Sequence, residues 1–139
     1  MAFREKSAWV MSAVMALTGV YYLNLVVSAS RSAGNTAPPT GILIAYVLLV
    51  VIASIIAQVA LAYSSPKEAN APADERERPA LDRAGNLAGV ILSSGTVISL
   101  LYFLYRGDAY LLFHMVMGSL IVAQIAEYAL QIVLLRRSA

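Results

Sequence analysis

The sequence contains no cysteine, a single histidine and few charged residues. Of its 139 residues only 13% are charged, whereas 60% are hydrophobic. Without cysteine the chain can form no disulfide bond, thiolate metal site or iron–sulfur cluster, and it has no cysteine nucleophile. The lone histidine, His114, cannot make a zinc or haem site without further ligands. The sequence therefore predicts no catalytic residue, no metal site and no cofactor.

The small share of charged residues also argues against an ordinary soluble domain. Soluble proteins are about 25% charged, and a chain of 139 residues could not bury this much apolar surface in one core. Lipid is the better solvent, so the lipid bilayer is the first expected partner. The formal net charge of +2 does not indicate nucleic acid, because the basic residues form no single patch and instead flank apolar stretches.

Four apolar segments approach or exceed the roughly 20 residues that a helix needs to cross a bilayer. Each must be a helix, because a lone segment in hydrocarbon has to satisfy its own backbone hydrogen bonds. The first segment is longer than the ~7–15 apolar residues of a signal-peptide core, so it is expected to remain uncleaved. The segments are Ala8–Ser28, Gly41–Tyr63, Asn86–Tyr105 and Tyr110–Leu135. The sequence thus predicts an all-α integral membrane protein, a four-helix bundle in which residues 1–139 form one domain.

The basic residues are divided unevenly between the two sides of this predicted bundle. One side receives Arg4, Lys6, Lys67, Arg76, Arg78, Arg83, Arg136 and Arg137, and the other receives only Arg31 and Arg106. Cytoplasmic segments of membrane proteins carry the excess of Lys and Arg. We therefore expect an antiparallel up-down topology, with both termini and the loop at 64–85 in the cytoplasm.

The two connections on the outer side differ in character. The stretch 31–40 is rich in Gly, Ser and Pro, and is expected to be irregular because Pro38 and Pro39 cannot continue a helix. The stretch 106–109 is short enough to force the third and fourth helices into an antiparallel hairpin.

The most distinctive polar feature is a charged run in the cytoplasmic loop, Asp74-Glu75-Arg76-Glu77-Arg78. Asp74 and Glu77 fit a capping box, although Pro79 opposes a helix that continues from it. The alternative places Pro79 in the first turn of an extended third helix, where its missing N–H costs little. The run is interpreted either as a solvated helix start or as a docking site for a cytoplasmic partner.

Glu127 is the outstanding residue inside the predicted membrane helices. Ionisable groups there are rare and are functional candidates by default. Gln124 and Gln131 lie on the same helical face as Glu127, at i−3 and i+4, and Gln58 of the second helix reaches a similar depth. These four residues are predicted to form one polar cluster in the membrane. The cluster either acts as a protonatable site, or stabilises helix packing or an oligomer interface by hydrogen bonding.

Small and aromatic residues complete the pattern. On the third helix Gly85, Gly89 and Ser93 are spaced by four, followed by Gly95 and Ser99, and such spacing predicts close helix packing.

Aromatic residues gather near the predicted membrane borders, where they form belts. The outer group contains Tyr21, Tyr22, Tyr46, Tyr102, Tyr105 and Tyr110, the inner group contains Trp9 and Tyr63, and His114 is expected to lie with the outer group.

Two short motifs resemble a known group of proteins. The charged run, followed by Ala84 and an apolar helix, resembles the loop of small four-helix prokaryotic membrane proteins of unknown function, the DUF2178-like group. The opening Phe3-Arg4-Glu5-Lys6-Ser7-Ala8-Trp9 is similar to the start of uncharacterised bacterial membrane proteins of that architecture. The resemblance implies the topology of that group and no established activity, and the chain is expected in the bacterial inner membrane.

Two functions remain open. The first is a non-enzymatic structural or accessory bundle that binds a partner, either a second copy in a homo-oligomer or another membrane protein. The alternative is a small proton-linked transporter or channel that uses Glu127. An enzyme is not predicted, because the chain lacks paired membrane carboxylates, a histidine cluster and a nucleophile–base pair.

Overall fold

The computed structural model describes residues 3–33, 40–72 and 74–138, and over these ranges the chain is helical apart from short connections. The helices are α1 (Phe3–Ala33), α2 (Thr40–Ser64), α3 (Pro66–Ala69), α4 (Glu77–Arg106) and α5 (Ala109–Ser138). Four of them, α1, α2, α4 and α5, are long and apolar enough to cross a membrane. The predictions of an all-α protein and of four apolar helices are confirmed, and the chain has the helices of a multi-pass membrane protein.

Each long helix extends past the apolar segment predicted for it, because polar residues at its ends continue the helical backbone. The largest difference is at α4, which begins at Glu77 and not at Asn86. The prediction of one loop over 64–85 is therefore wrong for residues 77–85, and α3 occupies part of the remainder. The irregular connection predicted around Pro38 and Pro39 falls on residues 34–39, outside the described part of the chain.

The start of α4 follows the interpretation that places Pro79 in the first turn of an extended helix. The N–H groups of Glu77 and Arg78 donate to the carbonyl oxygen of Asp74, at 3.0 and 3.1 Å. Half of the capping box is also present, since the Asp74 N–H donates to Glu77 Oε2 at 3.3 Å. The other half is replaced, because the Glu77 N–H donates to the Asp74 backbone carbonyl and the Asp74 carboxylate accepts from the Glu75 N–H at 2.7 Å.

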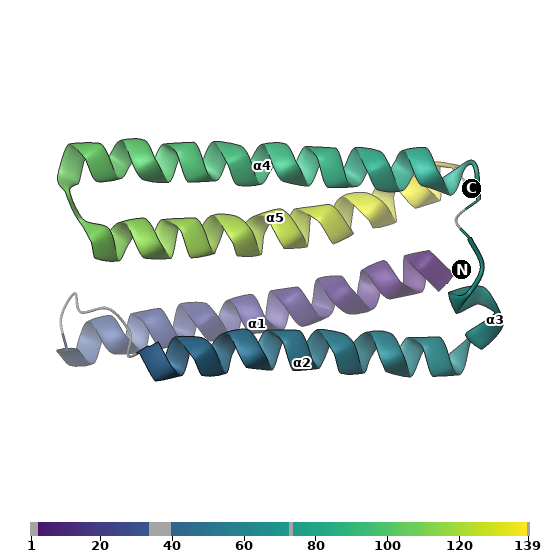
Figure 1. Ribbon diagram of the computed structural model, residues 1–139, viewed down its shortest axis with the longest axis horizontal. Coiled ribbons are helices and arrows are strands. Elements are labelled where there is room, and N and C mark those ends of the chain that lie inside the picture. The colour runs from purple at the N-terminus through teal and green to yellow at the C-terminus, as the bar shows by residue number, and fades with distance from the viewer. Residues whose placement is uncertain (1–2, 34–39, 73, 139) are drawn as a thin grey trace.

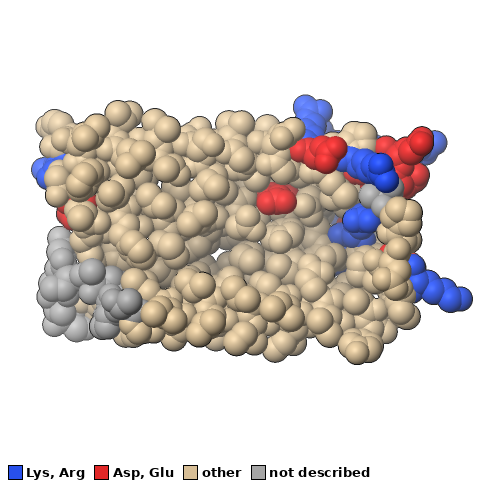
Figure 2. Space-filling model, viewed as in Figure 1, with Lys and Arg blue, Asp and Glu red and all other residues tan. Residues whose placement is uncertain are grey.

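The four long helices lie side by side in two pairs, α1 with α2 and α4 with α5 (Figure 1). The pairs meet mainly where α1 packs against α5, so α1 and α5 occupy the centre, while α2 has its extensive contacts with α1 and the short α3. Figure 1 also shows the N- and C-terminal ends and α3 at the same end of the molecule. Figure 2 shows that charged side chains gather at the ends, most densely at the one that holds the termini, and leave the middle largely uncharged.

The connection between α4 and α5 is a tight turn built from two residues. Gly107 has a left-handed backbone with φ of 68°, and its N–H donates to the Phe103 carbonyl at 2.7 Å, which ends α4. A residue with a Cβ atom adopts this conformation at a steric cost, so glycine is favoured here. Asp108 then caps α5, since its Oδ1 accepts from the Leu111 N–H at 3.0 Å.

Small residues allow α4 and α5 to approach closely. A Cβ atom added at Gly95 would lie 2.7 Å from the Cβ of Ser119, and Ser99 is only 1% exposed. The packing role predicted for Gly95 and Ser99 is thereby confirmed. The same prediction is wrong for Gly85 and Gly89, where an added Cβ would meet nothing within 4 Å.

Buried alanines take the place of those glycines in the contact face of α4. Ala80, Ala84 and Ala88 are buried, and they continue the spacing of four toward the start of the helix. The buried positions of α4 in this region therefore lie one residue before the predicted glycines. A helix surrounded by apolar residues offers no polar side to orient it, so small residues alone do not identify the buried face.

Candidate functional site

Glu127 lies on α5, well inside the candidate membrane span Ala109–Arg137. Its Oε1 accepts a hydrogen bond of 3.3 Å from Nε2 of Gln131, one turn further along the helix. Both side chains are partly buried. Neither the Arg4–Glu77 ion pair nor the Arg136–Glu5 ion pair involves Glu127. The carboxyl group is thus held by a neutral amide.

Gln58 forms its own pair with α1. Its Nε2 donates to Ser7 Oγ at 3.1 Å, and the Ser7 hydroxyl donates to Gln58 Oε1 at 3.2 Å. The pair joins α1 to α2 across 51 residues of sequence. The four residues predicted as one membrane polar cluster are therefore divided in the described structure: Glu127 bonds to Gln131, and Gln58 bonds to Ser7.

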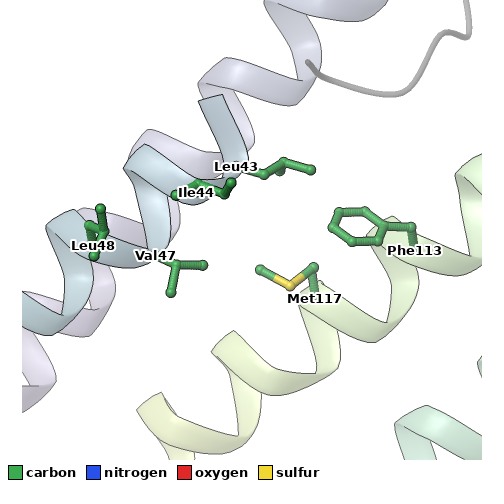
Figure 3. Close-up of a pocket in the computed structure, with 6 residues that line it drawn as sticks. All are labelled: Leu43, Ile44, Val47, Leu48, Phe113 and Met117. Atoms are coloured by element: carbon green, nitrogen blue, oxygen red, sulfur yellow. The ribbon is translucent and has the colours of Figure 1, made fainter. Parts of the chain in front are cut away.

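Gln124 lines a hollow between the helix pairs. The hollow has a volume of about 280 Å³ and is otherwise lined mainly by apolar side chains of α1, α2 and α5. A neighbouring hollow of about 370 Å³ is lined by Leu43, Ile44, Val47, Leu48, Phe113 and Met117. Figure 3 shows these six residues, with Val47 on α2 directed toward Met117 on α5. The two hollows share the lining residues Val47 and Met117 and therefore adjoin, and we call them together the α2–α5 groove.

An aromatic cluster around His114 joins α1, α2 and α5. The Tyr22 hydroxyl lies 2.7 Å from Nδ1 of His114, and the Tyr22 and Tyr46 rings pack with centroids 5.1 Å apart. The Tyr110 and Phe113 rings meet His114 edge-on, at 4.3 and 5.5 Å. Nε2 of His114 is buried without a hydrogen-bond partner among the described residues.

This cluster corrects the expectation of an aromatic belt at two of its members. Tyr22 is 3% exposed and Tyr46 is 5% exposed, so both belong to the interior. Tyr21, Tyr63 and Tyr105, which were also predicted for the belts, are exposed. Tyr22 and His114 were both predicted to lie in the outer halves of their helices, and this shared depth was the available signal for their contact. Which helices are neighbours was not predictable from depth alone.

The charged end of the molecule is tied together by contacts from the first turn of α1. Arg4 Nε lies 3.2 Å from Glu77 Oε2, and its Nη2 donates to the Ala71 carbonyl at 3.3 Å. Glu5 Oε1 lies 2.7 Å from Arg136 Nε, and the Arg136 guanidinium sits 5.7 Å from the Trp9 ring centre. These contacts connect α1 to the start of α4 and to the end of α5.

The charged run at 74–78, interpreted either as a solvated helix start or as a docking site, takes part in this network. Glu77 is the acidic partner of Arg4, and Asp74 bonds to the backbone of Glu75 and to Glu77. Glu75, Arg76 and Arg78 are exposed at the same end of the chain. The run thus lies partly against the molecule's own N-terminal helix and partly in solvent.

Within the described ranges, no three His, Asp or Glu side chains lie close enough together to hold a metal ion. Comparison of the chain with protein-family models, with curated proteins and with solved structures finds no match. The polar pairs, the α2–α5 groove and the charged end are therefore the features that bear on function.

Proposed function

We propose that this protein is a non-catalytic accessory bundle of the bacterial inner membrane, which presents α2 to a partner. The observation that carries the proposal is the pairing of polar groups inside the spans. Ser7 bonds to Gln58 and Tyr22 bonds to His114, so both pairs join different helices. Polar side chains used in this way hold helices together in lipid, where hydrophobic driving force between helices is weak.

The surface for the partner is the outer face of α2. Among the described residues this helix has its extensive contacts with α1 and α3, and it exposes a row of large apolar side chains that includes Ile52, Ile55, Ile56 and Val59. Such a face is compatible with lipid and with a helix of another protein or of a second copy. A homodimer or a complex with another membrane protein is therefore part of the proposal.

The proposal also includes an antiparallel up-down topology with both termini in the cytoplasm. It is supported by the eight basic residues assigned to one side in the sequence, and by the position of the two chain ends and α3 at one end of the molecule (Figure 1). Membership of the DUF2178-like group would fit this topology, and we retain it as part of the proposal.

The accessory function makes a specific prediction for Glu127. Glu127→Gln keeps an acceptor for Gln131, so the free energy of unfolding should change by less than about 0.5 kcal/mol. Glu127→Ala removes that acceptor and should destabilise the bundle by about 0.5–1.5 kcal/mol. Unfolding in mixed detergent and SDS, followed by circular dichroism, measures both variants. Equal destabilisation by the two substitutions would contradict a hydrogen-bonding role.

The second candidate function is a small proton-linked transporter or channel. It is favoured by one observation, a carboxyl group inside a membrane span that is paired only with a neutral amide among the described residues. Its test is flux into proteoliposomes under an imposed pH gradient. A flux that Glu127→Gln abolishes while the protein stays folded would replace the accessory function with transport, and the absence of any flux would leave the accessory function standing.

A further inference from the structure

The α2–α5 groove continues along three helices toward a polar end. On α5 the lining residues Met117, Leu120 and Gln124 follow a spacing of three and four, and the same spacing then reaches Glu127 and Gln131. Glu127 and Gln131 therefore lie on the same helical face of α5 as the lining residues, nearer to the C-terminal end of the helix.

The other two helices reach the same level. On α2 the lining residues Val47 and Val51 are followed at the same spacing by Ser54 and then Gln58. On α1 the lining residue Met15 is preceded, at intervals of four, by Met11 and Ser7. Because Ser7 and Gln58 are hydrogen-bonded to each other, these faces of α1 and α2 meet beyond the apolar part of the groove. We call Ser7, Gln58, Glu127 and Gln131 the polar end of the groove.

The groove therefore has the polarity of an amphiphile. Its opposite end is lined entirely by apolar residues, including Leu43, Phe113 and Met117. Its polar end contains one acidic group and no basic one, and the two Arg residues in ion pairs are held by Glu77 and Glu5. A carboxylate in a medium of low dielectric constant interacts strongly with a cation.

The dimensions of the groove favour one alkyl chain. Volumes of about 370 and 280 Å³ are at the lower end of small-molecule sites. The rise from Phe113 to Glu127 along α5 is roughly 21 Å at ~1.5 Å per residue. An alkyl chain can follow this path while its head group lies beside Glu127.

We propose that the α2–α5 groove binds a single-chain amphiphile with a cationic amine head group, with its chain between Val47 and Met117 and its ammonium group at Glu127. This binding is a property beyond the accessory function, and it does not require that the molecule be moved across the membrane. The same carboxylate and the same apolar walls recognise this molecule whether it is a substrate or a stabilising ligand.

The test uses the full chain in phosphatidylcholine nanodiscs and radiolabelled dodecyltrimethylammonium, whose charge is permanent. Empty nanodiscs give the non-saturable partitioning of this probe into lipid. We expect the protein to add a saturable component that unlabelled probe displaces. Glu127→Gln should weaken this component by about tenfold or more, and Val47→Trp should abolish it by filling the groove. Val97→Trp, at an exposed position of α4 outside the groove, is the matched control and should bind normally.

Folding is checked for each variant by helix content and by its thermal midpoint, and Met117→Trp replaces Val47→Trp if the latter does not fold. The proposal fails if the wild type shows no saturable component, or if Glu127→Gln binds as tightly as the wild type. It also fails if zwitterionic dodecylphosphocholine competes as well as the cationic probe, since the groove would then select only a chain. A dimer that dissociates with Val47→Trp would show that a second copy fills the groove, and would likewise overturn the proposal.

Discussion

At the scale of single residues, the best-defined polar contact within the spans is that between the Tyr22 hydroxyl and Nδ1 of His114. Both groups lie in an apolar environment, and Nε2 of the same imidazole already lacks a partner among the described residues. A second unpaired nitrogen on this ring would carry a desolvation cost with no compensating hydrogen bond. Tyr22 is therefore expected to matter for its hydroxyl group as well as for its ring.

The contribution of the Tyr22 hydroxyl to stability can be measured separately from that of its ring. Tyr22→Phe keeps the ring packing against Tyr46 but leaves His114 Nδ1 unpaired, which should destabilise the protein by about 1–3 kcal/mol. The adjacent and exposed Tyr21 is the matched control, and Tyr21→Phe should change stability by less than about 0.5 kcal/mol. SDS-induced unfolding measures both. Equal stability of the two variants would show that the contact has no net value.

At the scale of helices, the long apolar elements were predictable but their contacts were not. Hydrophobic length alone predicts α1, α2, α4 and α5, because a spanning segment must be a helix. The first turns of α4 were missed, since Pro79 is equally consistent with a loop and with the start of a helix. The division of the polar cluster was missed for a different reason. Depth in the membrane places Gln58 level with Glu127, but the choice of partner depends on which helices are neighbours, and here Ser7 of α1 is the closer partner.

The packing of α4 against α5 yields a prediction with an internal control. Gly95→Ala would place a methyl group against the Ser119 side chain close to its backbone, and such overpacking should destabilise the pair by about 1–3 kcal/mol. Gly89→Ala, on the same helix, meets open space and should be neutral or stabilising by up to about 1 kcal/mol. Thermal unfolding of the two variants distinguishes them, and a stable Gly95→Ala would contradict the close approach of the helices.

At the scale of the whole molecule, the first turn of α1 holds the charged end together. Arg4 bonds to Glu77 and Glu5 bonds to Arg136, so α1 is linked to both helices of the other pair. The Glu5–Arg136 contact is partly exposed, and the Glu5 side chain is the less exposed of the two, at 13%. A partly exposed ion pair adds little to the free energy of unfolding, and salt reduces that contribution further.

The value of this pair can be measured by a double-mutant cycle. Glu5→Gln and Arg136→Gln, alone and together, should give a coupling of about 0.2–1 kcal/mol that decreases in high salt. Arg136→Gln also removes the contact with Trp9, and the cycle separates that effect from the ion pair. A coupling indistinguishable from zero at low salt would mean that other contacts hold this end.

The proposed placement of the chain in the membrane is tested most directly by measuring which side of the membrane each end of the bundle faces. The sequence contains no cysteine, so one introduced cysteine is the only thiol that a maleimide can label. Ala71→Cys reports on the charged end and Ala109→Cys reports on the turn between α4 and α5, and both positions are exposed. In intact cells a membrane-impermeant maleimide should label Ala109→Cys at once, and should label Ala71→Cys only after permeabilisation. Labelling of Ala71→Cys in intact cells would contradict the proposed cytoplasmic location of both termini.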